Sequence, residues 1–249
     1  MRDAITKYVN DGGIFAVCTG RILASILPRV RSLGLKGLVI ACQGTVIADI
    51  ESGKYIRCGG LAPNETYEVC SAIEELGHPV NAYSGAGFIS SIPEDNKYLK
   101  IYEDIIGVKA DHVGMPVSRY ILENNIICQK IAVLCTPEDR VPLYNCLREK
   151  FSQKYDVTCS ADVLVEVSPI GATKGGALKF LAEHYSIDIG DTVAIGDNLN
   201  DLSMIEVAGV GVAVGNGVAE LKSKAKFVAC TNDEGAVKQV IELFGYRHD

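Results

Sequence analysis

Short apolar runs alternate with longer amphipathic stretches along this chain. The apolar runs cover residues 14–19, 37–42, 131–135 and 193–196, and each predicts a buried strand because so few polar positions interrupt it. Residues 23–33, with Pro28 as a kink, and residues 137–155 have the spacing of amphipathic helices. Strands alternating with helices are typical of an α/β protein with a parallel sheet wrapped by helices.

The strongest boundary signal is the glycine- and proline-containing segment 59–63, after which Asn64 is predicted to cap a helix. It divides the chain into a core formed by residues 1–60 and 166–249, and an inserted α/β domain formed by residues 61–165. Two short runs at residues 45–49 and 54–58 predict a hairpin ahead of this boundary.

Composition places the chain among ordinary globular proteins. It has 249 residues, of which 48% are hydrophobic and 22% charged, enough for one large or two modest domains. A net charge of −7 argues against nucleic acid and anionic membranes as partners. The sequence shows no apolar run of about 18 residues for a membrane span and no signal peptide, so a cytoplasmic location is expected.

Cysteine and histidine positions predict no metal or disulfide framework. The nine cysteines are an odd number, scattered and without a C-x-x-C pair, so reduced cysteines in a cytosolic protein are expected. The four histidines share no ligand spacing, which favours surface or core roles. They are His78, His112, His184 and His248.

The most informative segment is 193–209, an apolar strand that runs into a turn with Asp197, Asn200 and Asp201. Ligands of open α/β sheets bind at the carboxyl ends of the strands, where these residues are expected. Two carboxylates four residues apart repel unless they share a cation, and oxygen ligands favour magnesium. The alternative is an Asp/Asn-rich turn and helix cap.

A second candidate segment follows the strand at residues 14–19. Thr19 offers a hydroxyl group, Gly20 allows backbone N–H groups to approach closely, and Arg21 carries a guanidinium fork suited to phosphate. By itself, this pattern also fits a strand that ends in a polar turn.

A third candidate is Lys174, which opens a helix after a predicted strand at residues 163–167. A lysine at a helix N-terminus opposes the helix dipole, and an anion bound there would explain it; the alternative is a solvated lysine in a loop. The glycine-dense segment 209–217 does not fit a dinucleotide-binding loop, because Val214 takes the place of the third glycine.

In this order, Thr19-Gly-Arg21, a long insert, Lys174-Gly175 and Gly196-Asp-x-x-Asn-Asp201 resemble the haloacid dehalogenase superfamily of phosphatases, in particular its Cof-like type IIB branch. The resemblance covers nearly the whole chain, including the closing segment 209–229. It implies a Rossmann-like α/β core with a parallel sheet, and an inserted α/β cap domain that closes over the leaving group of a small phosphorylated metabolite.

The resemblance also implies a role for each site residue. Thr19, Gly20, Arg21, Lys174 and Asn200 would bind the phosphoryl group, and Thr19, Lys174 and Asp201 would form the catalytic set. Asp197 and Asp201 would belong to a Mg²⁺ site, Asp201 through water or by orienting the lysine.

The family's first strand and its Asp-x-Asp-Gly-Thr nucleophile motif are not found: Met1 stands where the next helix should begin, and no Asp-x-Asp occurs in the sequence. Two functions therefore stay open. One is a magnesium-dependent phosphatase whose chain is truncated and impaired, which the joint presence of the other site residues favours. The other is an inactive phosphate-binding or scaffold protein. The missing strand should leave two exposed sheet edges, so that these edges close up or another segment or chain fills the slot; self-association is one such outcome.

Overall fold

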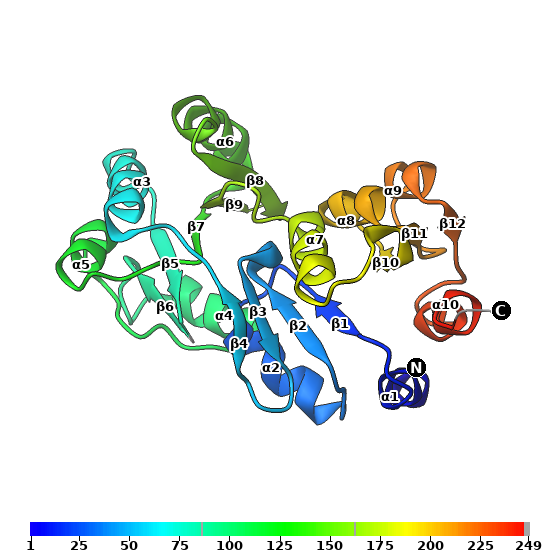
Figure 1. Cartoon of the computed structure of the whole chain (residues 1–249). Helices are drawn as coiled ribbons and strands as arrows, with labels where there is room; N and C mark the ends of the chain where they lie inside the picture. The colour runs from blue at the N-terminus through cyan, green and yellow to red at the C-terminus, as the bar shows by residue number, and fades with distance from the viewer. Residues whose placement is uncertain (86, 162, 247–249) are drawn as a thin grey trace. The chain divides into compact units, whose positions relative to one another are not determined.

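The computed structural model describes residues 1–85, 87–161 and 163–246, and the chain divides into two compact units. The first contains Met1–Gly20, Leu27–Ile56 and the chain from Thr173 on; the second contains Arg21–Ile26 and Arg57–Ala172. The predicted insert, residues 61–165, falls within the second unit. Strands and helices alternate in both units (Figure 1), which confirms the expected α/β class.

The first unit has two separate sheets. One is ordered β1–β2–β3–β4 and the other β10–β11–β12. The pairs β1–β2, β10–β11 and β11–β12 are parallel, whereas β2 and β3 are antiparallel, so the core is mixed. The strands are β1 (Ala16–Cys18), β2 (Leu38–Ala41), β3 (Val46–Asp49), β4 (Tyr55–Cys58), β10 (Val193–Gly196), β11 (Val210–Ala213) and β12 (Phe227–Val228).

Helices pack around these sheets. Leu181 of α7 packs in an apolar cluster with Leu38, Ile40 and Ile47 of β2 and β3. The helices and 3₁₀ turns are α1 (Arg2–Asn10), α2 (Leu23–Ser32), η1 (Cys42–Gly44), α7 (Lys174–His184), η2 (Ile189–Asp191), η3 (Leu199–Asp201), α8 (Leu202–Val207), α9 (Ala219–Lys224) and α10 (Ala236–Phe244). The first turn of α2, up to Ile26, is assigned to the second unit.

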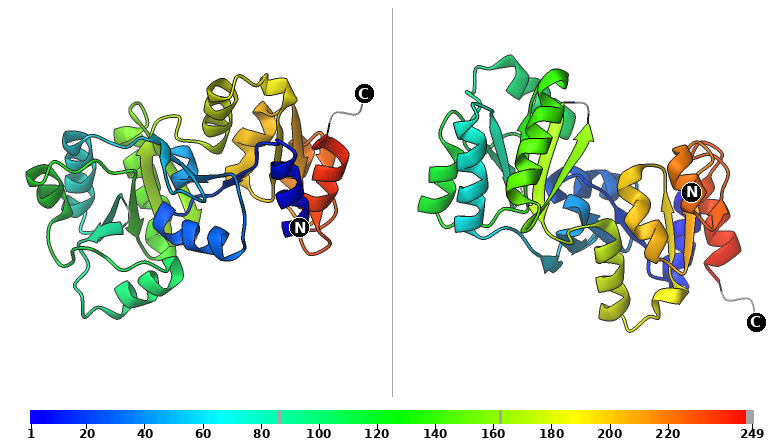
Figure 2. Two further views of the ribbon diagram at one scale, coloured as in Figure 1. Left: turned by 60° about the horizontal axis from the view of Figure 1, so that its bottom comes forward. Right: turned by 90° about the horizontal axis from the view of Figure 1, so that it is seen from above.

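Residues 2–10 form a helix and contribute no strand, as the sequence predicts. Helix α1 lies beside α10 (Figures 1 and 2), where the rings of Tyr8 and Tyr246 meet edge to face with centroids 5.9 Å apart. Ile5 is the buried residue of α1. The chain start is therefore held by side-chain packing against the last helix.

The second unit is built on a five-stranded sheet ordered β6–β5–β7–β9–β8. Helices α3, α5 and α6 cover one face and share a core with it that includes Val69, Ile121 and Leu147. Tyr102 of α4 packs against Phe88 of β6, with ring centroids 5.8 Å apart. The elements are α3 (Pro63–Glu75), β5 (Val80–Ser84), β6 (Gly87–Ser90), α4 (Lys97–Ile106), α5 (Val117–Glu123), β7 (Lys130–Leu134), α6 (Pro137–Phe151), β8 (Tyr155–Ala161) and β9 (Leu164–Pro169).

One helix start differs from the prediction. Helix α3 begins at Pro63 with Ala62 as its N-cap, so the prediction that Asn64 caps it is wrong. Proline suits the first helical position because its φ is already helical and it has no N–H to satisfy. Glu65 then accepts a hydrogen bond from the Ala62 amide at 2.7 Å.

Each helix in the part of the chain that the structure describes is too short or too polar to cross a bilayer.

Candidate functional site

The turn after β10 folds back so that Asp201 lies beneath the strand end. One Asp201 carboxylate oxygen, Oδ2, accepts hydrogen bonds from the backbone N–H groups of Asp197 at 2.9 Å and Asn198 at 3.1 Å. Gly196 makes this possible, because a Cβ atom there would lie 2.4 Å from the Asp201 Cβ. The turn thus holds Asp201 in one orientation.

The other carboxylate oxygen of Asp201 binds Lys174. Nζ of Lys174 lies 2.5 Å from Oδ1 of Asp201, and their side chains are only 7% and 4% exposed. Thr173 caps α7 by accepting a hydrogen bond from the Gly176 amide at 3.0 Å, which fixes Lys174 at the first helical position. The N-terminus of α7 is the positive end of the helix dipole and disfavours a lysine. The Asp201 carboxylate compensates for this by pairing with Lys174.

Asp197 and Asn200 lie on the exposed side of the same turn. Partial loss of hydration and the nearby Asp201 carboxylate raise the pKa of Asp197, because both disfavour its charged form. The turn therefore combines a buried ion pair with an exposed carboxylate and an exposed amide, and a cation binding to Asp197 would relieve this repulsion.

The carboxyl end of β1 lies near the Lys174–Asp201 pair. The Cys18 thiol is close enough to Lys174 and Asp201 for their charges to act on it, and burial raises its pKa to about 12. Thr19 continues the ladder by donating its N–H to the Ile40 carbonyl at 2.8 Å. The structure thus brings the Thr19 segment and the Lys174–Asp201 pair together within the first unit.

Arg21 is the predicted phosphate-binding residue that falls in the second unit. Its guanidinium donates to the Ile105 carbonyl of α4 at 3.5 Å. The first unit holds the other six predicted residues, which are Thr19, Gly20, Lys174, Asp197, Asn200 and Asp201.

Replacing Asp197 with asparagine should raise the free energy of unfolding by less than about 1 kcal/mol without magnesium. The substitution removes a carboxylate that Asp201 repels, and the small size of the gain reflects solvent screening. Chemical denaturation measures it. In excess Mg²⁺ the gain should vanish, and a variant less stable than the parent without Mg²⁺ would contradict the assignment of this repulsion.

Among the described residues, no cluster of three or more histidine, cysteine, aspartate or glutamate side chains could hold a metal ion. Asp197 is exposed and Asp201 is committed to Lys174 and two backbone amides. The described residues thus offer a hard cation at most half a site, in which the exposed Asp197 would be the direct ligand.

The sequence pattern did not single out three residues that shape the site. They are Thr173, which caps α7, Asn198, whose side chain accepts a hydrogen bond from the Leu199 amide at 2.7 Å, and Ser203, whose Oγ accepts one from the Gly175 amide at 3.1 Å. The threonine before the helix was a readable capping signal. The other two depend on how the turn folds.

Two of the histidines, His112 and His184, make ring contacts. His184 stacks on Phe180, with centroids 5.9 Å apart, and His112 hydrogen-bonds the Tyr120 hydroxyl at 2.5 Å. His248 lies outside the described residues.

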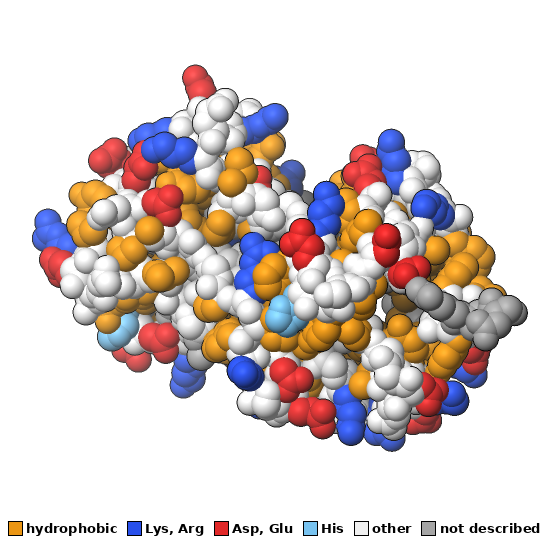
Figure 3. Space-filling model, viewed as in Figure 1, with side chains coloured by type: hydrophobic (Ala, Val, Ile, Leu, Met, Phe, Trp, Pro, Cys, Tyr) orange, Lys and Arg blue, Asp and Glu red, His pale blue; other side chains and the backbone are white. Residues whose placement is uncertain are grey.

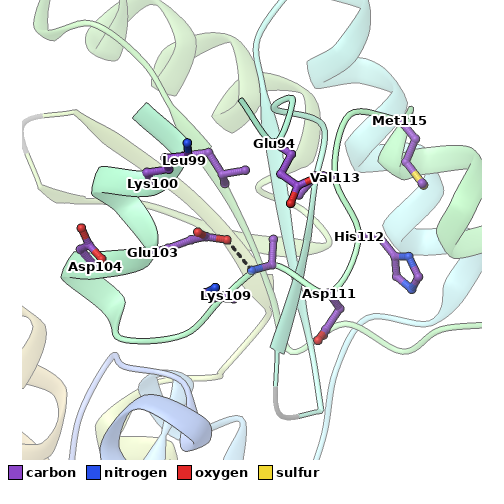
Figure 4. Close-up of a pocket in the computed structure, with 11 residues that line it drawn as sticks. Glu94, Leu99, Lys100, Glu103, Asp104, Lys109, Asp111, His112, Val113 and Met115 are labelled. Carbon is purple, nitrogen blue, oxygen red and sulfur yellow. Dashed lines mark hydrogen bonds between the residues drawn. The ribbon is translucent and has the colours of Figure 1, made fainter. Parts of the chain in front are cut away.

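A pocket of about 630 Å³ lies in the second unit (Figure 4), between α4 and the segment leading from it to α5. Glu94, Asp104 and Asp111 line it together with Lys100 and Lys109. None of the seven predicted site residues contributes to it.

A mixed α/β core thus places a lysine, two aspartates and the Thr19 segment near neighbouring strand ends. A family model described as haloacid dehalogenase-like hydrolase matches residues 1–241. The chain therefore belongs to the haloacid dehalogenase-like hydrolase family.

Individual relatives agree with this. The chain is 28% identical over 261 residues to phosphatase YwpJ of Bacillus subtilis, covering 96% of this chain and 90% of the relative. It is also 28% identical over 262 residues to the 5-amino-6-(5-phospho-D-ribitylamino)uracil phosphatase YwtE of the same organism, covering 97% and 89%. The solved structure of TM0651 from Thermotoga maritima matches with a TM-score of 0.85 and 26% identity, covering 100% of this chain and 90% of that one.

Proposed function

We propose that this chain carries the binding half of a magnesium-dependent phosphatase site for small phosphorylated metabolites, with hydrolysis impaired by the lack of an Asp-x-Asp motif. The observation that carries this proposal is the buried Lys174–Asp201 pair beside the exposed Asp197 and Asn200. The printed names of YwpJ and YwtE support a phosphatase, and that of YwtE supports a small phosphorylated metabolite as the substrate class.

Each side chain would stabilise the phosphoryl group through a different electrostatic contact. The Lys174 ammonium would offset charge on the phosphoryl group, and the Thr19 hydroxyl, the Gly20 amide and the Asn200 amide would donate hydrogen bonds to its oxygens. Mg²⁺ held by Asp197 would supply Lewis-acid stabilisation of phosphoryl charge, while Asp201 keeps Lys174 in place.

The chain's charge distribution supports a small molecule as partner. Acidic and basic side chains are interspersed over the face drawn in Figure 3, with no broad basic area there. Nucleic acid and anionic membranes reward clustered lysine and arginine.

Catalytic inactivity is the second candidate, because no Asp-x-Asp occurs in the sequence. A phosphate-binding or scaffold protein would need the same Lys174 and Thr19 contacts without a nucleophile. The two candidates differ only in whether turnover appears once an aspartate nucleophile is present.

Measuring phosphate release distinguishes the phosphatase from the inactive phosphate-binding or scaffold protein. The chain alone should release negligible phosphate from an aryl phosphate or a panel of sugar phosphates with Mg²⁺. A form with an apolar strand ending in Asp-x-Asp-Gly-Thr joined ahead of Met1 should release it in a Mg²⁺-dependent manner. If that form folds and stays inactive, the scaffold role stands; robust turnover by the chain alone would place the active site elsewhere.

Magnesium binding by the chain alone should be weak, with a Kd in the millimolar range, because Asp197 is a single direct carboxylate and the ion keeps most of its waters. Isothermal titration or NMR shifts measure it. Asp197→Asn should abolish the signal, whereas Asp233→Asn, at another exposed aspartate, should not. Tight stoichiometric binding would mean that another carboxylate, such as Glu206 or Asp49, completes the site.

A further inference from the structure

The turn that follows β2 has three consecutive residues with positive φ. Cys42, Gln43 and Gly44 of η1 have φ values of 49°, 57° and 118°. A positive φ is uncommon for a residue other than glycine, so two such residues in succession persist only where the surrounding structure fixes them. One constraint is the hydrogen bond that the Gln43 N–H donates to the Thr19 carbonyl at 3.1 Å.

The start of α7 fixes the same turn from another side. A Cβ atom at Gly44 would lie 2.5 Å from the Thr173 carbonyl oxygen, so a residue with a side chain does not fit at this point. Thr173 is the N-cap of α7 and directly precedes Lys174. The turn is therefore held between the carboxyl end of β1 and the lysine of the proposed phosphate site.

This backbone conformation places the Gln43 side chain against Gly20. A Cβ atom at Gly20 would lie 2.6 Å from Nε2 of Gln43 and 3.1 Å from its Cδ. The glycine thus leaves room for the Gln43 amide group to lie on the backbone that is expected to bind phosphate. Gln43 is only partly buried, so a ligand from solvent can reach the two N–H donors of its side chain.

We propose that Gln43 is a further phosphoryl-binding residue, whose side-chain amide donates a hydrogen bond to the phosphoryl group held by Thr19 and Gly20. The inference rests on the proposed function and adds to that site a residue from the end of β2. A donor that carries no charge suits this position, because Lys174 supplies the cation and a hydrogen bond to a charged oxygen is stronger than one between neutral groups. Backbone held in an uncommon conformation is typical of ligand-binding positions.

Nuclear magnetic resonance of the full chain with inorganic phosphate tests this, because the side-chain NH₂ group of Gln43 gives signals of its own. As phosphate is added, these signals and the Gly20 amide signal should shift with one shared Kd. Loss of the side-chain signals in Gln43→Met assigns them. The side-chain signals of Gln153, an exposed glutamine in the second unit, should not shift.

Variants of Gln43 measure the contribution of the amide group. Gln43→Met keeps the length of the side chain without its donors and should raise the Kd for phosphate by at least about fivefold. Gln43→Glu should raise it further, because a carboxylate repels the phosphoryl group. Gln153→Met is the matched control and should leave the Kd unchanged.

Gln43→Gly distinguishes a ligand contact from a structural role. Glycine adopts a positive φ without steric cost, so this variant should be at least as stable as the parent in chemical denaturation. It should nevertheless bind phosphate more weakly, because the amide group is gone. A residue that only shaped the turn would not change stability and affinity in opposite directions.

Two patterns of result would contradict the inference. If the Gly20 signal shifts with phosphate while the Gln43 side-chain signals do not, or if Gln43→Met and Gln43→Gly bind phosphate as tightly as the parent, Gln43 is not a ligand and the proposed phosphate site stands without it. If neither Gly20 nor Gln43 responds to phosphate, both this inference and the proposed site are wrong. Each of these measurements reports binding and does not depend on turnover.

Discussion

Replacing Lys174 with methionine is expected to lower the free energy of unfolding by about 3–5 kcal/mol, the range for breaking a buried ion pair. Methionine keeps much of the length of the side chain but leaves the Asp201 carboxylate without its cation. Asp201 is 3% exposed, so water cannot replace the lost contact, and its remaining partners are the two backbone amides of its own turn. Urea denaturation of both proteins measures the difference.

A matched control isolates burial as the cause. Lys238 forms an ion pair with Glu242 at 3.7 Å on the exposed face of α10, with side chains 58% and 61% exposed. Lys238→Met should cost less than about 1 kcal/mol. The double variant Lys174→Met/Asp201→Leu should recover much of the loss, because it leaves no buried charge. Equal effects of Lys174→Met and Lys238→Met would show that the buried pair contributes no special stability.

In a form of the chain that carries an added Asp-x-Asp strand and turns over phosphate esters, Asp197→Asn is expected to lower kcat by at least about 10³-fold. The expected loss is large because nucleophile, metal ligand and charge neutralisation act as one unit, and removing one member forfeits most of the benefit. Steady-state phosphate release across a range of Mg²⁺ concentrations measures it. Lys174→Ala should show a similar loss.

Measuring the free energy of unfolding of these variants distinguishes a loss of catalysis from a loss of folded protein. Asp197→Asn is expected to leave the protein at least as stable as its parent in the absence of Mg²⁺, so lost turnover there cannot come from unfolding. Asp233→Asn, a charge-matched change at an exposed loop position, should retain turnover. Activity that is insensitive to Asp197 would show that the turn after β10 is not the metal site.

Local features of the fold could be predicted from the sequence, since they depend on neighbouring residues. The apolar runs that form β1, β2 and β10 and the helix that begins at Lys174 are all readable from periodicity and turn residues. The sequence pattern places the cap of α3 at Asn64 instead of Ala62, because the proline preference for the first helical turn outweighs the capping preference of Asn64.

The order of three motifs also indicated the family, and the family model confirms it. The sequence determined which residue types follow which strands: a threonine after β1, and two aspartates with an asparagine after β10. Ligands of open α/β sheets bind at the carboxyl ends of the strands, and the family resemblance implied that Thr19 and Asp197 belong to one such site.

Only the tertiary structure decided what those residues do to one another. Lys174 and Asp201 are 27 residues apart, and their pairing depends on α7 and the turn after β10 meeting. The sequence allowed Lys174 to be a solvated loop residue or an anion site, and Asp201 to be a metal ligand or an orienting group. The structure shows that Lys174 is a buried helix residue paired with Asp201 and not a solvated loop residue, because a buried charge requires a partner.

The separation of the core strands into two sheets likewise depends on contacts between residues far apart in the sequence. Which strands pair, and in which register, depends here on contacts between segments far apart in the chain, whereas turn type and loop length fix register in a hairpin. The sequence by itself thus determined the elements, the family and the residue types at the strand ends. The tertiary structure decided the ion pair, the exposed carboxylate and the division of the core strands into two sheets, because each depends on contacts between distant segments.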